Sequence, residues 1–308
     1  MAKGQVALKR LTEDEARETL EGLIWANGRV CPHCGNCDQA RIVGLKANAK
    51  SDVRPGLYRC KECRKQFTVT VGSIFEGSKV ALRDWVYAFA AMCASKKGIS
   101  ALQLSRELGC QYKTAWFMCH RIRLAMRTED MQKLMGTVSV DETYVGGKPR
   151  NPGEGKPKMP VVALVEKGGR ARSRVTPDVT AANLRKHMTE NIDKTAVIHT
   201  DELPMYKNLA KPFGGHQRVN HSNRQFVGKD GANSNEVESY FALLKRGIYG
   251  TFHNVSPQHL QRFVDEFDFR WSNRYVSDTE RTFVAIGQAK GKRLMYREAK
   301  KPAEGLWG

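Results

Sequence analysis

Hydrophobic and polar positions follow different periods in successive parts of the chain. Before about residue 79, short apolar stretches alternate with turn-rich segments. From there to about residue 132, apolar residues recur every three or four positions, which predicts helices. From Gly136 onward, strand-like and helix-like segments alternate. The pattern therefore predicts two small N-terminal modules followed by an α/β domain.

The middle part of the chain is expected to hold three helices. The first places Leu82, Trp85 and Phe89 on one face, with Cys93 or Met92 continuing it. A short second helix ends at Gly109, and a third begins near Tyr112. Two short helices joined by a turn that contains glycine are typical of a helix-turn-helix unit, although a small helical linker would give the same pattern.

The third of these helices divides into an inner and an outer face. Ala115, Cys119, Ile122 and Met126 form the expected inward stripe. The remaining polar and basic positions are expected to face outward, where they would reach base edges or phosphates in a major groove. The residues expected to face outward are Lys113, Thr114, Phe117, Arg121 and Arg123, and all of them except Phe117 are candidates for DNA binding.

Two predicted strands of the α/β part end in an acid. Val138 and Val140 lead into Asp141, and the segment TAVIHTDE leads into Asp201. Strands at MPVVALVE, ARSRV and HQRVNH, and a helix that begins at Thr180, complete the expected set. Strand ends in α/β sheets are where functional groups converge, so the two acids are expected to share a site.

A later helix, NSNEVESYFALLKRGIYG, carries further charged residues beside an apolar stripe. Glu238 and Lys245 are seven residues apart, which aligns them within roughly 20° around the helix axis. Asn235 falls within roughly 60° of Glu238, whereas Glu236 lies on the opposite flank. Taken alone, this flank fits a solvated helix surface as well as a functional one. The apolar stripe is Val237, Phe241, Leu244 and Ile248.

Charge narrows the choice of partner. The 308 residues include 51 Lys and Arg against 32 Asp and Glu, giving a net charge of +19 and a pI near 9.7. Such a surplus favours a polyanion, and nucleic acid is the commonest one. The longest apolar run, residues 86–94, is too short to span a bilayer, and the first residues contain no apolar signal core. We therefore expect a cytoplasmic protein with no membrane partner.

Four of the eight cysteines have the spacing of a metal site. Cys31 and Cys34 form one CxxC pair, and Cys60 and Cys63 form another. Each pair places two thiolates on a tight turn, and two such turns complete a closed tetrahedral Zn²⁺ site, which stabilises a fold and does not catalyse. His33 and Cys37 lie close enough in sequence to compete as the fourth ligand. The module is expected to be a structural zinc ribbon.

The ordered set of motifs resembles the Asp-Asp-Glu transposases and retroviral-type integrases, and within them one group of bacterial insertion-sequence transposases, the insertion-sequence-1595 group. The likeness extends from about residue 25 to 275. It is carried by the zinc ribbon, the helix-turn-helix and five motifs: VDETYVGGK, HTDELPMY, NEVE, LLKRGIYGTFHNVS and EFDFRWSNR.

The resemblance implies an RNase H-like mixed-sheet catalytic domain that cleaves DNA and transfers strands. Asp141, Asp201 and Glu238 would hold two Mg²⁺ or Mn²⁺ ions, for which carboxylates are suitable hard ligands. Lys245 would contact phosphate near the scissile bond, and Arg246 is a further DNA-binding candidate. Asn235 competes with Glu238 as third ligand; Glu238 is favoured because a carboxylate binds a divalent cation better than an amide. Pairing two DNA ends implies a homodimer or a higher oligomer.

The predicted organisation has five parts, and two rival functions remain. The rivals are a DNA-binding regulator with an inactive α/β domain and a stand-alone nuclease of the same fold. The parts are an N-terminal helical segment (1–24), the zinc ribbon (25–78), the helix-turn-helix module (79–132), the catalytic domain (133–278) and a solvated basic tail (279–308).

Overall fold

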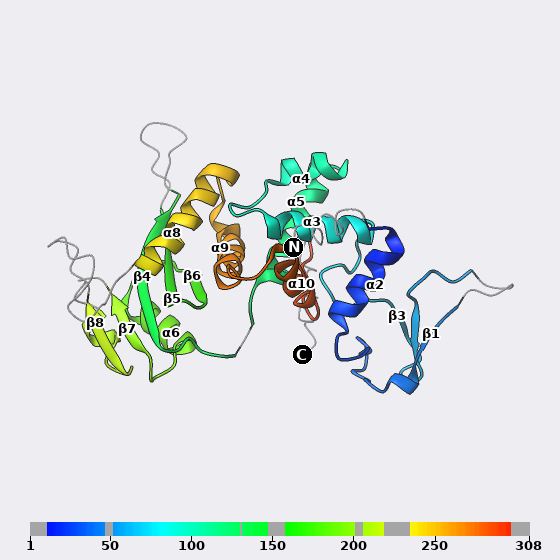
Figure 1. Ribbon diagram of the computed structural model, residues 1–308, viewed down its shortest axis with the longest axis horizontal. Coiled ribbons are helices and arrows are strands. Elements are labelled where there is room, and N and C mark those ends of the chain that lie inside the picture. The colour runs from blue at the N-terminus through cyan, green and yellow to red at the C-terminus, as the bar shows by residue number, and fades with distance from the viewer. Residues whose placement is uncertain are drawn as a thin grey trace, which may run out of the picture.

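The computed structural model describes residues 11–46, 52–129, 131–146, 158–200, 206–218 and 235–296. Figure 1 shows three parts along the long axis: a small ribbon with one helix, a central group of helices, and a sheet covered by helices. The fold is mixed α/β. None of the helices in these ranges has the length and apolarity that a membrane span requires.

The ribbon is a three-stranded antiparallel sheet that packs next to the first described helix. That helix, α2 (Glu13–Ile24), begins with a capping box in which Thr12 and Glu15 bond each other's backbone N–H groups. This arrangement satisfies donors that a helix start leaves free. The ribbon comprises the short helix η1 (Gln39–Arg41) and the strands β1 (Ile42–Gly44), β2 (Tyr58–Cys60) and β3 (Gln66–Phe67).

The central helices form one core, which we call the helical module. Helix α3 (Leu82–Ala94) buries eight of its thirteen residues, among them an unbroken run from Ala88 to Cys93. Helix α4 (Ala101–Leu108) ends at Gly109, whose φ of 62° places it in the left-handed region that glycine tolerates. Helix α5 (Tyr112–Met126) follows, and the predicted stripe of Ala115, Cys119, Ile122 and Met126 is buried, which confirms that part of the prediction.

The C-terminal segment completes the helical module, contrary to the expectation of a solvated tail. Helix α10 (Asp278–Gly287) packs on α2 and α3, and Ala285, Ile286 and Ala289 are fully buried there. This segment packs on the module because its apolar residues are interspersed among the basic ones. Residues 297–308 lie outside the described part of the chain.

The sheet has five strands in the order β6-β5-β4-β7-β8. The first three pair antiparallel, whereas β7 and β8 run parallel to β4. All the strands and the helix expected from the sequence are present within the described residues. They are β4 (Thr137–Val145), β5 (Met159–Glu166), β6 (Ala171–Val175), α6 (Ala181–Asn191), β7 (Val197–Thr200) and β8 (Gly215–Arg218). The short helix α7 (Tyr206–Leu209) lies between β7 and β8 and was not predicted.

Helices cover both faces of this sheet (Figure 1). Helix α6 packs on the face that carries Val138 and Val140. The other face is covered by α8 (Asn235–Gly247), η2 (Ile248–Phe252) and α9 (Pro257–Ser272). Gly247 permits the close approach of α8 to α9, because a Cβ atom there would clash with the ring of Phe267.

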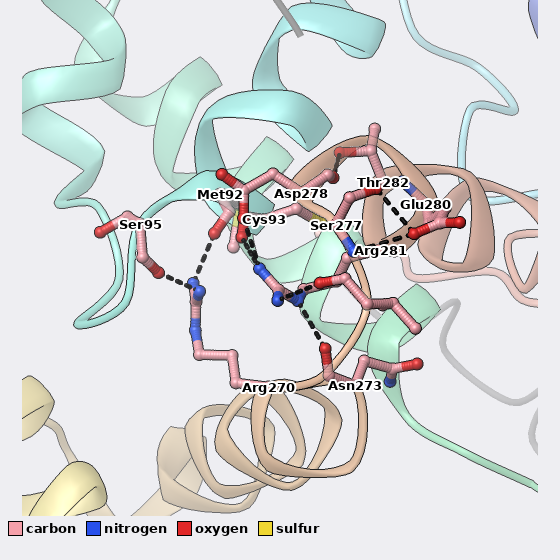
Figure 2. Close-up of polar contacts among 11 residues, drawn as sticks. Met92, Cys93, Ser95, Arg270, Asn273, Ser277, Asp278, Glu280, Arg281 and Thr282 are labelled. Carbon is pink, nitrogen blue, oxygen red and sulfur yellow. Dashed lines mark hydrogen bonds and ion pairs between the residues drawn. The ribbon is translucent and has the colours of Figure 1, made fainter. Parts of the chain in front are cut away.

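Helix α9 connects the sheet to the helical module. Most of its buried residues pack against the sheet, but Phe269 belongs to the core of the helical module. Figure 2 shows Arg270 of α9 and Arg281 of α10 reaching the C-terminal end of α3. Arg270 Nη2 donates to Met92 O at 2.6 Å, and Arg281 Nη1 donates to Cys93 O at 2.9 Å. Cations at a helix C-terminus stabilise it, so Arg270 fastens α9 to the helical module and Arg281 fastens α10 to α3 within it.

Two of the five residues expected to face outward from α5 are buried instead. Arg123 is 3% exposed and its Nε donates to Glu266 Oε2 of α9 at 2.7 Å. Arg121 is 8% exposed and its Nε donates to Leu294 O at 3.3 Å. The outward orientation predicted for both was wrong, because α9 and the C-terminal segment cover those positions.

His120 makes the contact between α5 and α9 sensitive to acid. It is buried, packs between Trp116 and His259, and neither ring nitrogen has a hydrogen-bond partner in the structure. Burial, with Arg123, Arg262 and His259 nearby, lowers its pKa to about 3. Because the folded pKa lies below the usual value of 6.5, the stabilisation is complete above pH 6.5 and declines as the pH falls towards 3.

We expect His120→Leu to flatten this acid dependence. Leucine removes the buried nitrogens and the charging penalty, so it should also raise the free energy of unfolding at pH 7.5 by about 1 kcal/mol. Urea midpoints of wild type and variant, compared at pH 7.5 and pH 4.5, would check it. An equal loss of stability in both proteins on acidification would contradict the assignment.

Candidate functional site: a four-cysteine cluster and the acids of the sheet face

The four predicted cysteines come together at one end of the ribbon. The Sγ atoms of Cys31, Cys34, Cys60 and Cys63 all lie within 4.8 Å of one another, and this is the cluster of metal-ligating side chains found within the described ranges. His33 and Cys37, the other candidates for the fourth ligand, lie outside this cluster. His33 Nε2 lies 3.2 Å from Gln66 O, and the cluster does not include Cys37.

The geometry of the cluster fits a structural zinc ion. Zn–S bonds of about 2.3 Å in a tetrahedron place the sulfur atoms roughly 3.8 Å apart. The Cys31–Cys63 and Cys34–Cys60 sulfur distances are 3.6 and 3.7 Å. A backbone hydrogen bond from Cys63, supported by the Asn36 amide, lowers the pKa of Cys60 to about 6. The cluster therefore has the number and spacing of sulfur ligands that Zn²⁺ requires.

Replacing Cys60 with serine is expected to remove zinc and unfold the ribbon. Structural Zn²⁺ contributes roughly 10–16 kcal/mol of binding free energy, far more than so small a sheet gains by packing. Zinc released from denatured protein, measured with a colorimetric chelator, should fall from about one ion per chain to near zero. Cys37→Ser is the matched control and should keep its zinc. A Cys60→Ser protein with full zinc content would refute the site.

Asp141 lies near the middle of β4, on the face that α8 and α9 cover. Its register partner on β5 is Ala163, which belongs to the core under those helices. Successive residues of a strand point to opposite faces. Accordingly Glu142 pairs with Val162, which belongs to the core under α6. Asp141 is half-buried, and its Oδ1 accepts the Glu142 backbone N–H at 2.8 Å.

Helix α8 presents three of the predicted site residues to solvent. Its stripe of Val237, Phe241, Leu244 and Ile248 is buried, which confirms the predicted orientation of the helix. Asn235, Glu238 and Lys245 are exposed, as is Arg246, whose Nε donates to Ala242 O at 3.0 Å. Since α8 packs against β4 and β5, Glu238 and Asp141 belong to adjoining layers of the same face.

The other acid of α8 has a structural partner. Glu236 Oε2 lies 3.6 Å from Arg274 Nη2. Arg274 in turn donates to Gly169 O and Trp271 O at the end of α9. This ion pair ties the start of α8 to the end of α9, whereas Glu238 lies on the opposite flank. The two acids of the NEVE motif therefore differ: Glu236 is half-buried in an ion pair with Arg274, and Glu238 is exposed.

Asp201 lies outside the described residues. The strand that leads to it is described: β7 ends at Thr200 and lies beside β4. His199 pairs in register with Ser139 and is buried. Residues 147–157, which include most of the proline-rich segment after β4, are likewise outside the described part.

Buried polar groups between the layers were missed by the sequence analysis. Glu266 is completely buried between Arg123 and Arg270. Asp268 accepts hydrogen bonds from Ser173 and from the Tyr240 hydroxyl, each at 2.7 Å. The Glu266 ion pair has a sequence signal: the acid lies beside the apolar stripe of α9, and Arg270 follows four residues later.

Matches to known proteins agree with this arrangement. Residues 133–272 match the ISXO2-like transposase domain, and residues 11–66 match the transposase zinc-ribbon domain. An uncharacterized protein in transposable element ISH50 of Halobacterium salinarum is 27% identical over 290 residues, which cover 84% of this chain and 91% of that protein. With both domains present in this order, the chain belongs to the insertion-sequence-1595 family of transposases.

Proposed function

We propose that the protein cuts the ends of its insertion sequence and joins them to target DNA. The observation that carries the proposal is the placement of two acids: Asp141 on the sheet face under α8, and Glu238 exposed on α8 itself. The strand order, with three antiparallel strands followed by two parallel ones, supports an RNase H-like fold for this domain.

Asp201 is the proposed third member of the set. His199 pairs with Ser139, and each is followed two positions later by one of the two aspartates. The proposal takes Asp141 and Asp201 as neighbours across the parallel pair of β4 and β7. Glu238 is preferred over Asn235 because a carboxylate supplies charge to a divalent cation.

The reaction consists of two displacements at phosphorus. In the first, a water oxygen bonds to phosphorus at the element end, and the 3′-oxygen leaves and takes a proton. In the second, that 3′-hydroxyl oxygen bonds to a target phosphorus, and the target's own 3′-oxygen leaves. One phosphodiester bond is exchanged for another, so strand transfer needs no ATP.

The residues have separate parts in these steps. Asp141, Asp201 and Glu238 would hold Mg²⁺ or Mn²⁺, which would supply Lewis-acid polarisation of the phosphate oxygens. Lys245 lies seven residues after Glu238 on the exposed flank of α8 and would bind a phosphate oxygen, and Arg246 would add charge beside it. The two DNA ends would be brought together by at least two copies of the chain.

Recognition of the element ends is assigned to α4 and α5. Lys113 is exposed and Thr114 half-exposed in the first turn of α5, where a recognition helix contacts base edges. Arg123 is left out of this role, since its charge is already paired inside the protein.

The proposal is tested with purified protein, Mn²⁺ and a labelled duplex that carries the element end with its flanking DNA. Wild type should give nicked ends and joined products on a sequencing gel, and Glu238→Gln should give neither. Glu236→Gln is the matched control on the same helix and should remain active. Nicking without joined products would identify a nuclease, and binding without cleavage in wild type would favour a DNA-binding regulator.

A further inference from the structure

A cavity of about 390 Å³ lies beside α5, away from the acids of the sheet face. We call it the α5 pocket. Its walls come from residues 77–80, from Trp85 of α3, from the outer side of α5 and from Tyr296. This volume is within the range of sites that hold one small molecule, roughly 300–1,000 Å³, and is too small for a duplex.

The charge of the lining selects an anion. Lys79, Lys113 and Arg121 line the α5 pocket, and its lining contains no Asp or Glu. By contrast, Asp265 and Asp268 line the cavity of about 400 Å³ between β6 and α9. Burial and the neighbouring Arg293 lower the pKa of Arg121, which an anion in the α5 pocket would reverse.

Aromatic rings form the rest of the wall. Phe117 lies under the Arg121 guanidinium, 4.6 Å from its ring centroid, and meets Tyr296 edge to face at 5.6 Å. Trp85 is held in place by a hydrogen bond from its Nε1 to Ser78 Oγ at 3.1 Å. Tyr296 is 62% exposed, so its side chain is accessible to a ligand.

The C-terminal segment holds Tyr296 at this position. Lys292 Nζ donates to Ala125 O at 3.0 Å, and Arg293 pairs with Glu76 at 3.2 Å. Leu294 O accepts from Arg121. The α5 pocket is thus assembled from three separate parts of the sequence, and the contacts between them hold its lining in place.

We propose that the α5 pocket binds one unpaired nucleotide, with its base stacked on the exposed ring of Tyr296 and its phosphate against Lys79, Lys113 and Arg121. Stacking accepts any base, and the cations follow the phosphate. The source assigned is an unpaired base of the DNA bound by α5, so the inference rests on the proposed function; a free nucleotide offers the same chemistry.

The test compares two labelled duplexes without added Mg²⁺, one fully paired and one with a single-base bulge. Fluorescence anisotropy with wild type should show tighter binding of the bulged duplex by about tenfold, the effect of one stacked base. Tyr296→Ala should remove this preference and leave the affinity for paired DNA unchanged. Tyr296→Phe should retain it, because the ring remains.

Tyr275→Ala is the matched control, since Tyr275 is also exposed but lies outside the α5 pocket. Equal affinity for both duplexes in wild type, or a preference that survives Tyr296→Ala, would overturn the DNA assignment. Deoxyadenosine monophosphate that binds wild type but not Tyr296→Ala, without any bulge preference, would assign the chemistry to a free nucleotide. Binding is read without cleavage, so a failure of the proposed catalysis would appear separately on the cleavage gel.

Discussion

Asp141→Asn is expected to reduce DNA cleavage by about a hundredfold to a thousandfold while leaving DNA binding intact. The amide keeps the shape of the side chain but loses the charge that would hold a divalent cation. Its position on the covered face of β4 also places it away from α4 and α5, which are assigned to DNA recognition. Cleavage is measured on the labelled duplex in Mn²⁺, and binding by anisotropy in its absence.

Glu142→Gln provides the control for this experiment. The two residues are adjacent in β4, yet Glu142 lies on the face that α6 covers. Its substitution should leave the cleavage rate within a few-fold of wild type. Cleavage by Asp141→Asn at the wild-type rate would remove Asp141 from the site, whatever the behaviour of the control.

Glu266→Gln is expected to lower the free energy of unfolding by about 3–5 kcal/mol. Glu266 is fully buried and accepts from Arg123 Nε at 2.7 Å and from Arg270 Nε at 3.1 Å. Burial alone would raise its pKa, but the two guanidinium groups outweigh it and hold the pKa below its usual value. The neutral amide would leave two buried cations without a countercharge.

Urea unfolding followed by near-UV circular dichroism measures this loss. Glu236→Gln breaks the more exposed pair with Arg274 and should cost no more than about 1 kcal/mol. Combining Glu266→Gln with Arg123→Met should recover part of the stability, because it removes one of the uncompensated charges. A loss below about 1 kcal/mol for Glu266→Gln alone would show that the network contributes little.

Local patterns predicted the elements because those patterns are themselves physical constraints. The stripe of α8, the buried stripe of α5 and the alternation in β4 each require one face to be removed from water. The doubled CxxC spacing required four sulfur atoms around one point, and the structure brings those four together. The helix and strand patterns depend on near neighbours in the chain, whereas the zinc site depends on a short CxxC motif that occurs twice.

Where distant segments meet was not readable from such patterns. Arg121 and Arg123 follow the spacing of an exposed helix face, and only the arrival of α9 and residues 292–296 buries them. Residues 278–289 appear as the start of a basic tail until α10 packs on α2 and α3. Charge along a sequence does not reveal whether a long-range partner neutralises it.

The sequence by itself determined the order of the modules, the zinc ligands, the orientation of α8 and the family resemblance, because each follows from a motif or a hydrophobic period that can be read directly along the chain. The tertiary structure alone decided which acid of α8 is tied to a structural arginine, which arginines of α5 are buried and how the α5 pocket is assembled. Those outcomes depend on contacts between residues tens to nearly two hundred positions apart, whose pairing is set by packing and not by local spacing.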